Sequence, residues 1–93
     1  MADTNPQGET VCHHVVYHGR VQGVGFRLTT THIARNFPLD GYVKNMPNRT
    51  VEIVVRSDQA TLEKFLKAVE DQFEGHIEKR EIREASANEC VEV

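Results

Sequence analysis

Two stretches with the hydrophobic period of an α-helix, set among strand-like segments, constrain the fold of this chain most strongly. In each stretch the apolar residues recur every three or four positions, which places them on one face of a helix. We expect Pro38 to end the first helix and Gly75 to end the second. The two apolar stripes consist of Phe26, Thr30, Ile33, Ala34 and Phe37, and of Leu62, Phe65, Leu66, Val69 and Phe73.

The segments between these stripes have the composition of short strands. Strands are predicted at Val11–Tyr17, Leu39–Lys44, Val51–Arg56 and Ile77–Arg83, with a further short one at Cys90–Val93. The "NMPNRT" segment suits a hairpin, and Ser57 or Asp58 can cap the second helix. The order strand, helix, strand, strand, helix, strand predicts a ferredoxin-like α/β (α+β) sandwich, an antiparallel βαββαβ sheet with both helices on one face.

Composition and charge exclude several classes of partner. The chain has 93 residues, 39% of them hydrophobic, and a formal net charge of -3, which argues against a general nucleic-acid or membrane surface. Residues 1–10 are polar and lack the basic and apolar regions of a signal peptide. We therefore expect a flexible lead-in over residues 1–10, a single domain over residues 11–93, a cytoplasmic location and a monomer.

Cysteines and histidines give no pattern of a metal site. Cys12 and Cys90 lie far apart in the sequence, and in a reducing compartment we expect free thiols, although a disulfide is left open. No Cys or His pair has the spacing of a structural zinc site together with a matching second pair. We therefore expect no metal site.

The segment "GRVQGVGFR", residues 19–27, joins the first strand to the first helix. Gly23 and Gly25 allow backbone conformations in which successive N–H groups can face an anion at the helix N-terminus. Arg27 in the first helical turn opposes the helix dipole, so its position makes sense beside a negatively charged ligand. Its planar guanidinium can hold two phosphate oxygens. The alternative is a tight turn with an exposed arginine.

Asn45 is expected to reach the same place through the topology of the sheet. A crossover helix joins the first two strands, so these strands run parallel and their C-terminal ends share one edge. Asn45 stands at the end of the second strand and carries both a donor and an acceptor for a water molecule. Its plain alternative is a hairpin asparagine, a role for which Asn48 is the better candidate.

"GRVQGVGFR" followed by "GYVKNMPNRTVEI" resembles the acylphosphatases, small enzymes that hydrolyse the mixed anhydride of a carboxylic and a phosphoric acid. The resemblance covers about Val11 to Phe73 and implies the ferredoxin-like sandwich that the periodicity also predicts. It further implies a small-molecule acyl phosphate as substrate, with no metal, no cofactor and no covalent intermediate.

The resemblance also implies roles for particular residues. In that family the arginine that ends the loop binds the substrate phosphate, and that position is Arg27 here. The loop amides share this task, and the asparagine after the second strand, here Asn45, orients the attacking water. An acid–base role for His18 or His32 is a lesser hypothesis. The loop residues concerned are Gln22, Gly23, Val24, Gly25 and Phe26.

Two segments depart from the family pattern. The hairpin usually has an acidic residue and a glycine before the strand, where this chain has Asn48, Arg49 and Thr50. After the second helix a Gly-Pro loop is common, whereas this chain reads "FEGHIEK". These differences concern the far edge of the sheet and leave Arg27 and Asn45 in place.

Three other functions are alternatives. One is a non-catalytic anion- or phosphate-binding module of the same fold, and another is an excised N-terminal domain of a hydrogenase-maturation carbamoyltransferase. The third, an RNA-binding ferredoxin-like domain, needs aromatic residues on the third strand, and "VEIVVRS" has none. The sequence does not select among acetyl phosphate, carbamoyl phosphate and 1,3-bisphosphoglycerate.

Overall fold

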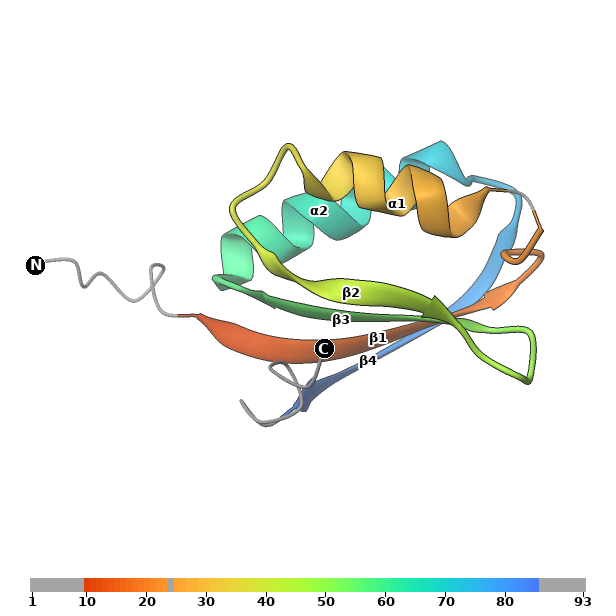
Figure 1. Ribbon diagram of the computed structural model, residues 1–93, viewed down its shortest axis with the longest axis horizontal. Coiled ribbons are helices and arrows are strands. Elements are labelled where there is room, and N and C mark those ends of the chain that lie inside the picture. The colour runs from red at the N-terminus through yellow and green to blue at the C-terminus, as the bar shows by residue number, and fades with distance from the viewer. Residues whose placement is uncertain (1–9, 24, 86–93) are drawn as a thin grey trace, which may run out of the picture.

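Two helices lie side by side on one face of a four-stranded antiparallel sheet (Figure 1). The computed structural model describes residues 10–23 and 25–85. The predicted βαββαβ order and ferredoxin-like arrangement are confirmed. The elements in chain order are β1 (Val11–Gly19), α1 (Phe26–Ala34), β2 (Asp40–Asn45), β3 (Val51–Ser57), α2 (Gln59–Gln72) and β4 (Ile77–Ala85).

The order of strands in the sheet brings the ends of β1 and β2 to one edge. The order is β2-β3-β1-β4, and both β1 and β2 pair antiparallel with β3. The two strands therefore run in the same direction with β3 between them, as the crossover argument predicted. Tyr17 near the end of β1 and Asn45 at the end of β2 are both paired with Val51.

The core lies between the sheet and the helices. Alternate residues of β1 and β3 point toward the helices and meet the apolar stripe of α2, and the first residue of α1 joins them. This alternation is the period expected of strands that bury one face. The fully or almost fully buried members are Val15, Tyr17, Val21, Phe26, Val51, Ile53, Val55, Leu62, Phe65, Leu66, Val69 and Phe73.

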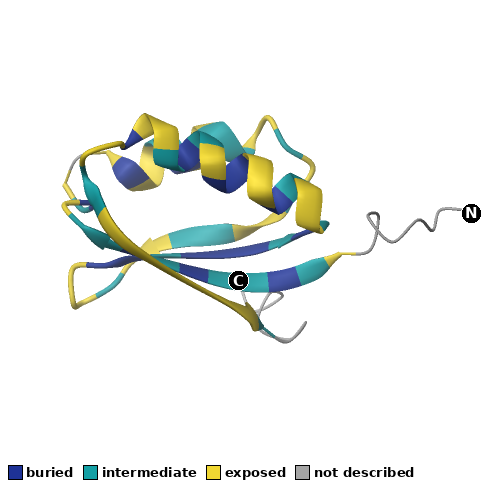
Figure 2. Ribbon diagram, turned by 180° about the vertical axis from the view of Figure 1, so that it is seen from behind, coloured by how far each residue is buried: buried dark blue, intermediate teal, exposed yellow. Residues whose placement is uncertain are grey.

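Strand β4 covers the outer edge of β1 but is itself exposed along most of its length (Figure 2). It pairs with β1 from Cys12 opposite Ala85 to Gly19 opposite Ile77, so it is longer than the segment predicted from the sequence. The predicted last strand at residues 90–93 lies outside the described residues, as do residues 1–9 of the lead-in.

The expectation of a free thiol was wrong for Cys12. This residue is buried on the sheet face away from the helices, beside Val54, and it is disulfide-bonded rather than a free thiol. Cys90, the other cysteine of the chain, lies outside the described residues. No spacing pattern of cysteines in the sequence predicts a disulfide at Cys12.

Both helices form where the stripes predict them, but the last residue of each stripe lies outside its helix: Phe37 follows α1, and Phe73 is the C-cap of α2. Helix α1 ends at Ala34, earlier than Pro38 suggested, because the N–H groups of residues 35–37 turn to carbonyls three residues back. Helix α2 has Asp58 as its N-cap, and the Asp58 side chain accepts a hydrogen bond from the Thr61 N–H. Gly75 follows α2 at φ 93°. Within the described part of the chain, no helix has the length and apolar character to span a bilayer.

Candidate active site

The loop between β1 and α1 uses its glycines for backbone conformation. Gly23 and Gly25 have φ angles of 81° and 79°, in the left-handed region that residues with a side chain avoid. A Cβ atom added at either position would meet nothing within 4 Å. The requirement for glycine at these two positions is therefore conformational and not steric.

The N-terminus of α1 is left open on the side of this loop. Gly25 is the N-cap and supplies no side chain, and no acidic residue stands in the first turn. The first intrahelical bond runs from the Thr29 N–H to the Gly25 carbonyl. The N–H groups that precede it have no partner within the helix, which makes this end a place where an anion is stabilised.

Phe26 anchors the start of α1 in the core. Its side chain is 1% exposed, and its ring centroid lies 4.5 Å from that of Phe73 and 5.5 Å from that of Tyr17. Packing in this aromatic cluster fixes the first turn of the helix. Arg27, the next residue, is exposed, and its side chain projects from this fixed first turn.

Arg27 and Asn45 line the same cavity. The cavity has a volume of about 200 Å³, and its wall also includes both loop glycines. Asn45 is exposed at the end of β2, and β2 and β1 run in the same direction with β3 between them (Figure 1). The structure thus brings together the two side chains that the sequence analysis singled out. The lining residues are Val21, Gly23, Gly25, Phe26, Arg27, Leu28 and Asn45.

Among the described residues of the predicted phosphate-binding loop, Gln22 alone is absent from the cavity wall. The side chain of Gln22 turns to the β2–β3 hairpin, where its Nε2 donates to the carbonyls of Met46 and Thr50 at 2.9 and 2.8 Å. Val24 lies outside the described residues. The cavity wall adds Leu28, which the sequence analysis missed because an apolar residue beside Arg27 gives no signal of a site.

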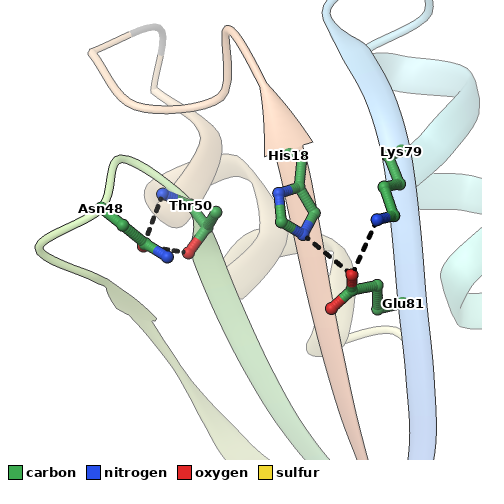
Figure 3. Close-up of polar contacts among 5 residues, drawn as sticks. All are labelled: His18, Asn48, Thr50, Lys79 and Glu81. Atoms are coloured by element: carbon green, nitrogen blue, oxygen red, sulfur yellow. Dashed lines mark hydrogen bonds and ion pairs between the residues drawn. The ribbon is translucent and has the colours of Figure 1, made fainter.

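The histidines considered for acid–base work have other surroundings. Nε2 of His18 lies 3.6 Å from Oε2 of Glu81, which also accepts from Nζ of Lys79 at 3.0 Å (Figure 3). These residues belong to β1 and β4, whereas Asn45 is on β2. His32 is exposed in the last turn of α1. Neither histidine is part of the cavity wall.

The hairpin asparagine is Asn48, as predicted. Its Oδ1 accepts from the hydroxyl and the N–H of Thr50, at 2.6 and 3.3 Å (Figure 3). This frees Asn45 from the turn and leaves its carboxamide at the cavity. In the described stretches, 10–23 and 25–85, no three His, Cys, Asp or Glu side chains are grouped as metal ligands.

Comparisons with known proteins show the family and the fold of the chain. The family model of the acylphosphatases matches residues 13–91. An acylphosphatase of Geobacillus kaustophilus is 41% identical over 76 residues, which cover 75% of this chain and 81% of that protein. One from Archaeoglobus fulgidus is 51% identical over 51 residues, covering 55% of this chain and 57% of the relative. The crystal structure of the Bacillus subtilis acylphosphatase superposes with a TM-score of 0.75 at 29% identity, covering 83% and 87% of the two chains.

A larger protein contains a similar part. The structure of full-length HypF in its phosphate- and nucleotide-bound form matches 90% of this chain with a TM-score of 0.76 at 26% identity. The match covers 11% of the HypF chain. The same fold therefore occurs both in small proteins and within a much longer one.

The sheet, the two helices on one face and the glycine loop that precedes α1 define a ferredoxin-like α/β protein. Within that class, the family model over residues 13–91 is decisive: the chain belongs to the acylphosphatase family. The enzyme class expected from the sequence, acylphosphatase, is the one that its relatives have.

Proposed function

We propose that this chain hydrolyses an acyl phosphate to a carboxylate and inorganic phosphate, without a metal ion. The observation that carries the proposal is the cavity of about 200 Å³ that Arg27 and Asn45 line together with the loop glycines. Its volume suits a phosphoryl group, and its wall supplies a cation and the open N-terminus of α1.

Arg27 and the loop amides hold the phosphoryl group in this proposal. The amides are those of residues 22–26, and the guanidinium of Arg27 makes a bidentate contact with two phosphoryl oxygens. Negative charge spreads over these oxygens in the transition state, so fixed donors around them lower the barrier. The phosphoryl dianion then lies between the guanidinium of Arg27 and the N-terminus of α1. It balances the positive charge of both.

Asn45 orients the nucleophile. Its carboxamide oxygen accepts from a water molecule, whose oxygen forms a bond to phosphorus while the bond from phosphorus to the acyl oxygen breaks. The carboxylate leaves with the electron pair of that bond, and a proton of the water passes to a phosphoryl oxygen. A carboxylate is a good leaving group, so positioning does most of the catalytic work and a histidine base is not required.

Turnover of benzoyl phosphate in excess EDTA tests the proposal. Wild type, Arg27→Gln and Asn45→Ala are compared, and phosphate binding by the three proteins is recorded alongside. Loss of the Arg27 contact should reduce the rate by about a hundredfold or more, which corresponds to about 3 kcal/mol. Asn45→Ala should lower turnover by about a hundredfold, which leaves a measurable rate, and should keep phosphate binding.

Two outcomes contradict the proposal. Phosphate binding without turnover in wild type indicates the anion-binding module of the same fold. Turnover that stops on addition of EDTA and returns with a divalent ion indicates a metal-dependent reaction. The site chemistry is the same whether the chain acts alone or as a domain of a longer protein, so a HypF-like context does not alter these expectations.

The proposal includes a small-molecule substrate, a monomer and a cytoplasmic location. The net charge of -3 gives no basis for a nucleic-acid or membrane surface. The disulfide at Cys12 is typical of oxidising compartments, so the location needs its own test, fractionation of the cells that make the protein. Light scattering at working concentration tests the monomer.

A further inference from the structure

The side chain of Gln22 connects the glycine loop to the β2–β3 hairpin. Its Nε2 donates two hydrogen bonds, one to the Met46 carbonyl at 2.9 Å and one to the Thr50 carbonyl at 2.8 Å. A carboxamide nitrogen has two N–H groups, so both are used. Gln22 belongs to the loop that follows β1, and its two acceptors flank the turn that follows β2.

The two acceptors are the carbonyls that close the hairpin. The Thr50 carbonyl also accepts from the Met46 N–H at 2.9 Å, and the Met46 carbonyl also accepts from the Arg49 N–H at 3.1 Å. Each carbonyl oxygen thus uses both of its lone pairs. Gln22 therefore binds the hairpin at the point where backbone hydrogen bonds close the turn.

Asn45 directly precedes this closed turn. Thr50 is 5% exposed, and its hydroxyl and N–H are held by Asn48 on the side of the turn (Figure 3). With Thr50 fixed from within the hairpin and from Gln22, the backbone at Met46 has little freedom. The sheet register holds Asn45 opposite Val51, and the carboxamide of Gln22 adds a direct tie between the glycine loop and the turn beside Asn45.

We propose that Gln22 is a positioning residue that fixes Asn45 against Arg27 across the cavity. This inference rests on the proposed function and adds a side-chain role to the backbone amide of Gln22. A displacement of about 1 Å in a group that orients a reactant can reduce the rate about a hundredfold. Gln22→Glu would place an anion against the two carbonyl oxygens, whereas Gln22→Met fills the same space without a hydrogen-bond donor. Gln22→Met is therefore the variant for the test.

Steady-state kinetics of a double-mutant cycle test the proposal. The proteins are wild type, Gln22→Met, Asn45→Ala and the double variant, with benzoyl phosphate as substrate. The control is Gln59→Met, because the Nε2 of Gln59 donates to Oε2 of Glu63 at 3.0 Å on the exposed surface of α2. We expect Gln22→Met to lower kcat about tenfold or more and to change the Kd of inorganic phosphate less than about threefold.

The cycle separates positioning from a general structural role. If Gln22 acts through Asn45, Gln22→Met should lower kcat less than about twofold in a protein that already carries Asn45→Ala. A full tenfold loss in that background overturns the proposal. So does a loss of phosphate affinity as large as the loss of kcat, because Gln22 then acts on the phosphate loop. Gln59→Met should leave both quantities unchanged.

A measurement that does not need turnover keeps the two proposals distinct. In heteronuclear NMR spectra, Gln22→Met should shift or broaden the side-chain amide resonances of Asn45, and Gln59→Met should not. Unchanged Asn45 resonances overturn the positioning role even in an active enzyme. If wild type is inactive on benzoyl phosphate, the proposed function fails while the spectra still decide whether Gln22 fixes Asn45. Gln22→Asn, which keeps the carboxamide on a shorter stem, serves if Gln22→Met does not fold.

Discussion

The hydroxyl of Tyr17 donates a hydrogen bond to Oε2 of Glu70 at 2.8 Å, although the tyrosine is completely buried in the core. Arg80 donates to the same carboxylate oxygen at 2.6 Å. Burial, together with the neighbouring carboxylate of Glu70, raises the pKa of Tyr17 far above its ordinary value. The hydroxyl therefore remains protonated and serves as a donor from β1 to α2.

Removal of Glu70 should destabilise the protein more than removal of the Tyr17 hydroxyl. Glu70→Ala leaves that buried hydroxyl without its acceptor, which costs about 1–3 kcal/mol, whereas Tyr17→Phe removes the donor and costs about 1 kcal/mol. Urea unfolding of both single variants and the double variant measures this. The double variant should lose less than the sum of the two, and strict additivity contradicts the bond as described.

Arg49→Gly should stabilise the protein. Arg49 has φ 71°, a left-handed conformation that costs about 1–2 kcal/mol in a residue with a Cβ. The greater freedom of glycine in the unfolded chain offsets about 0.4–1 kcal/mol of this, which leaves a gain in stability of about 0–1.6 kcal/mol. Arg35→Gly is the matched control, because Arg35 has φ -65° and the same change there should destabilise. Thermal unfolding compares them, and a loss of stability in Arg49→Gly contradicts the strain.

The stability of α2 should decrease at acid pH through Asp58. Hydrogen bonds from Thr61 lower the pKa of Asp58 from its ordinary value of 3.8. A carboxyl with a lowered pKa in the folded state stabilises that state above the unfolded pKa, and this contribution disappears as the pH falls through the folded pKa. Asp58→Asn keeps a cap that does not titrate. The urea midpoint of wild type minus that of Asp58→Asn should be constant between pH 7 and 5 and decrease below about pH 4. A constant difference down to pH 2 contradicts this.

Leu28 should influence which acyl group is accepted. Its side chain is 66% exposed and lines the cavity beside Arg27, so an acyl group that projects from the bound phosphate can cover it. Partial burial of a leucine is worth about 1 kcal/mol, or about fivefold in KM. Leu28→Ser should therefore raise KM for benzoyl phosphate about fivefold and leave acetyl phosphate almost unchanged. An equal change for both substrates refutes an acyl contact.

Reduction of the disulfide should affect stability and leave the site intact. Cys12 is paired with Arg56 and Ala85 at the start of β1, whereas the cavity lies beyond the other end of that strand. A disulfide stabilises a fold by about 2–4 kcal/mol, so reductant should lower the thermal midpoint of wild type without changing kcat. Cys12→Ala should be insensitive to reductant. A fall in kcat on reduction would contradict this separation.

The fold could be predicted because local pattern and topology agree. The apolar stripe that begins at Phe26 and the one that ends at Phe73 predict two helices, and these two rings meet at 4.5 Å in the core. Topology alone predicted that Arg27 and Asn45 share one end of the sheet, and the two residues do line one cavity.

The features that the sequence did not predict depend on contacts between distant segments. Gln22 bonds to a hairpin whose distance from the loop is set by the whole sheet. The partner of Tyr17 lies on α2, and the sequence offers many carboxylates there. The early end of α1 was missed because Pro38 sets only the latest point at which the helix can end. It does not require the helix to continue that far.

The position of β4 beside β1 has a consequence for synthesis of the chain. Every residue assigned to the site precedes β3, so the ribosome makes all of them well before Ile77–Ala85 emerges. Until then the outer edge of β1 presents unpaired N–H and carbonyl groups, which can pair with strands of other chains. A nascent chain arrested before β4 therefore has every residue of the site but an open sheet, and we expect it to aggregate.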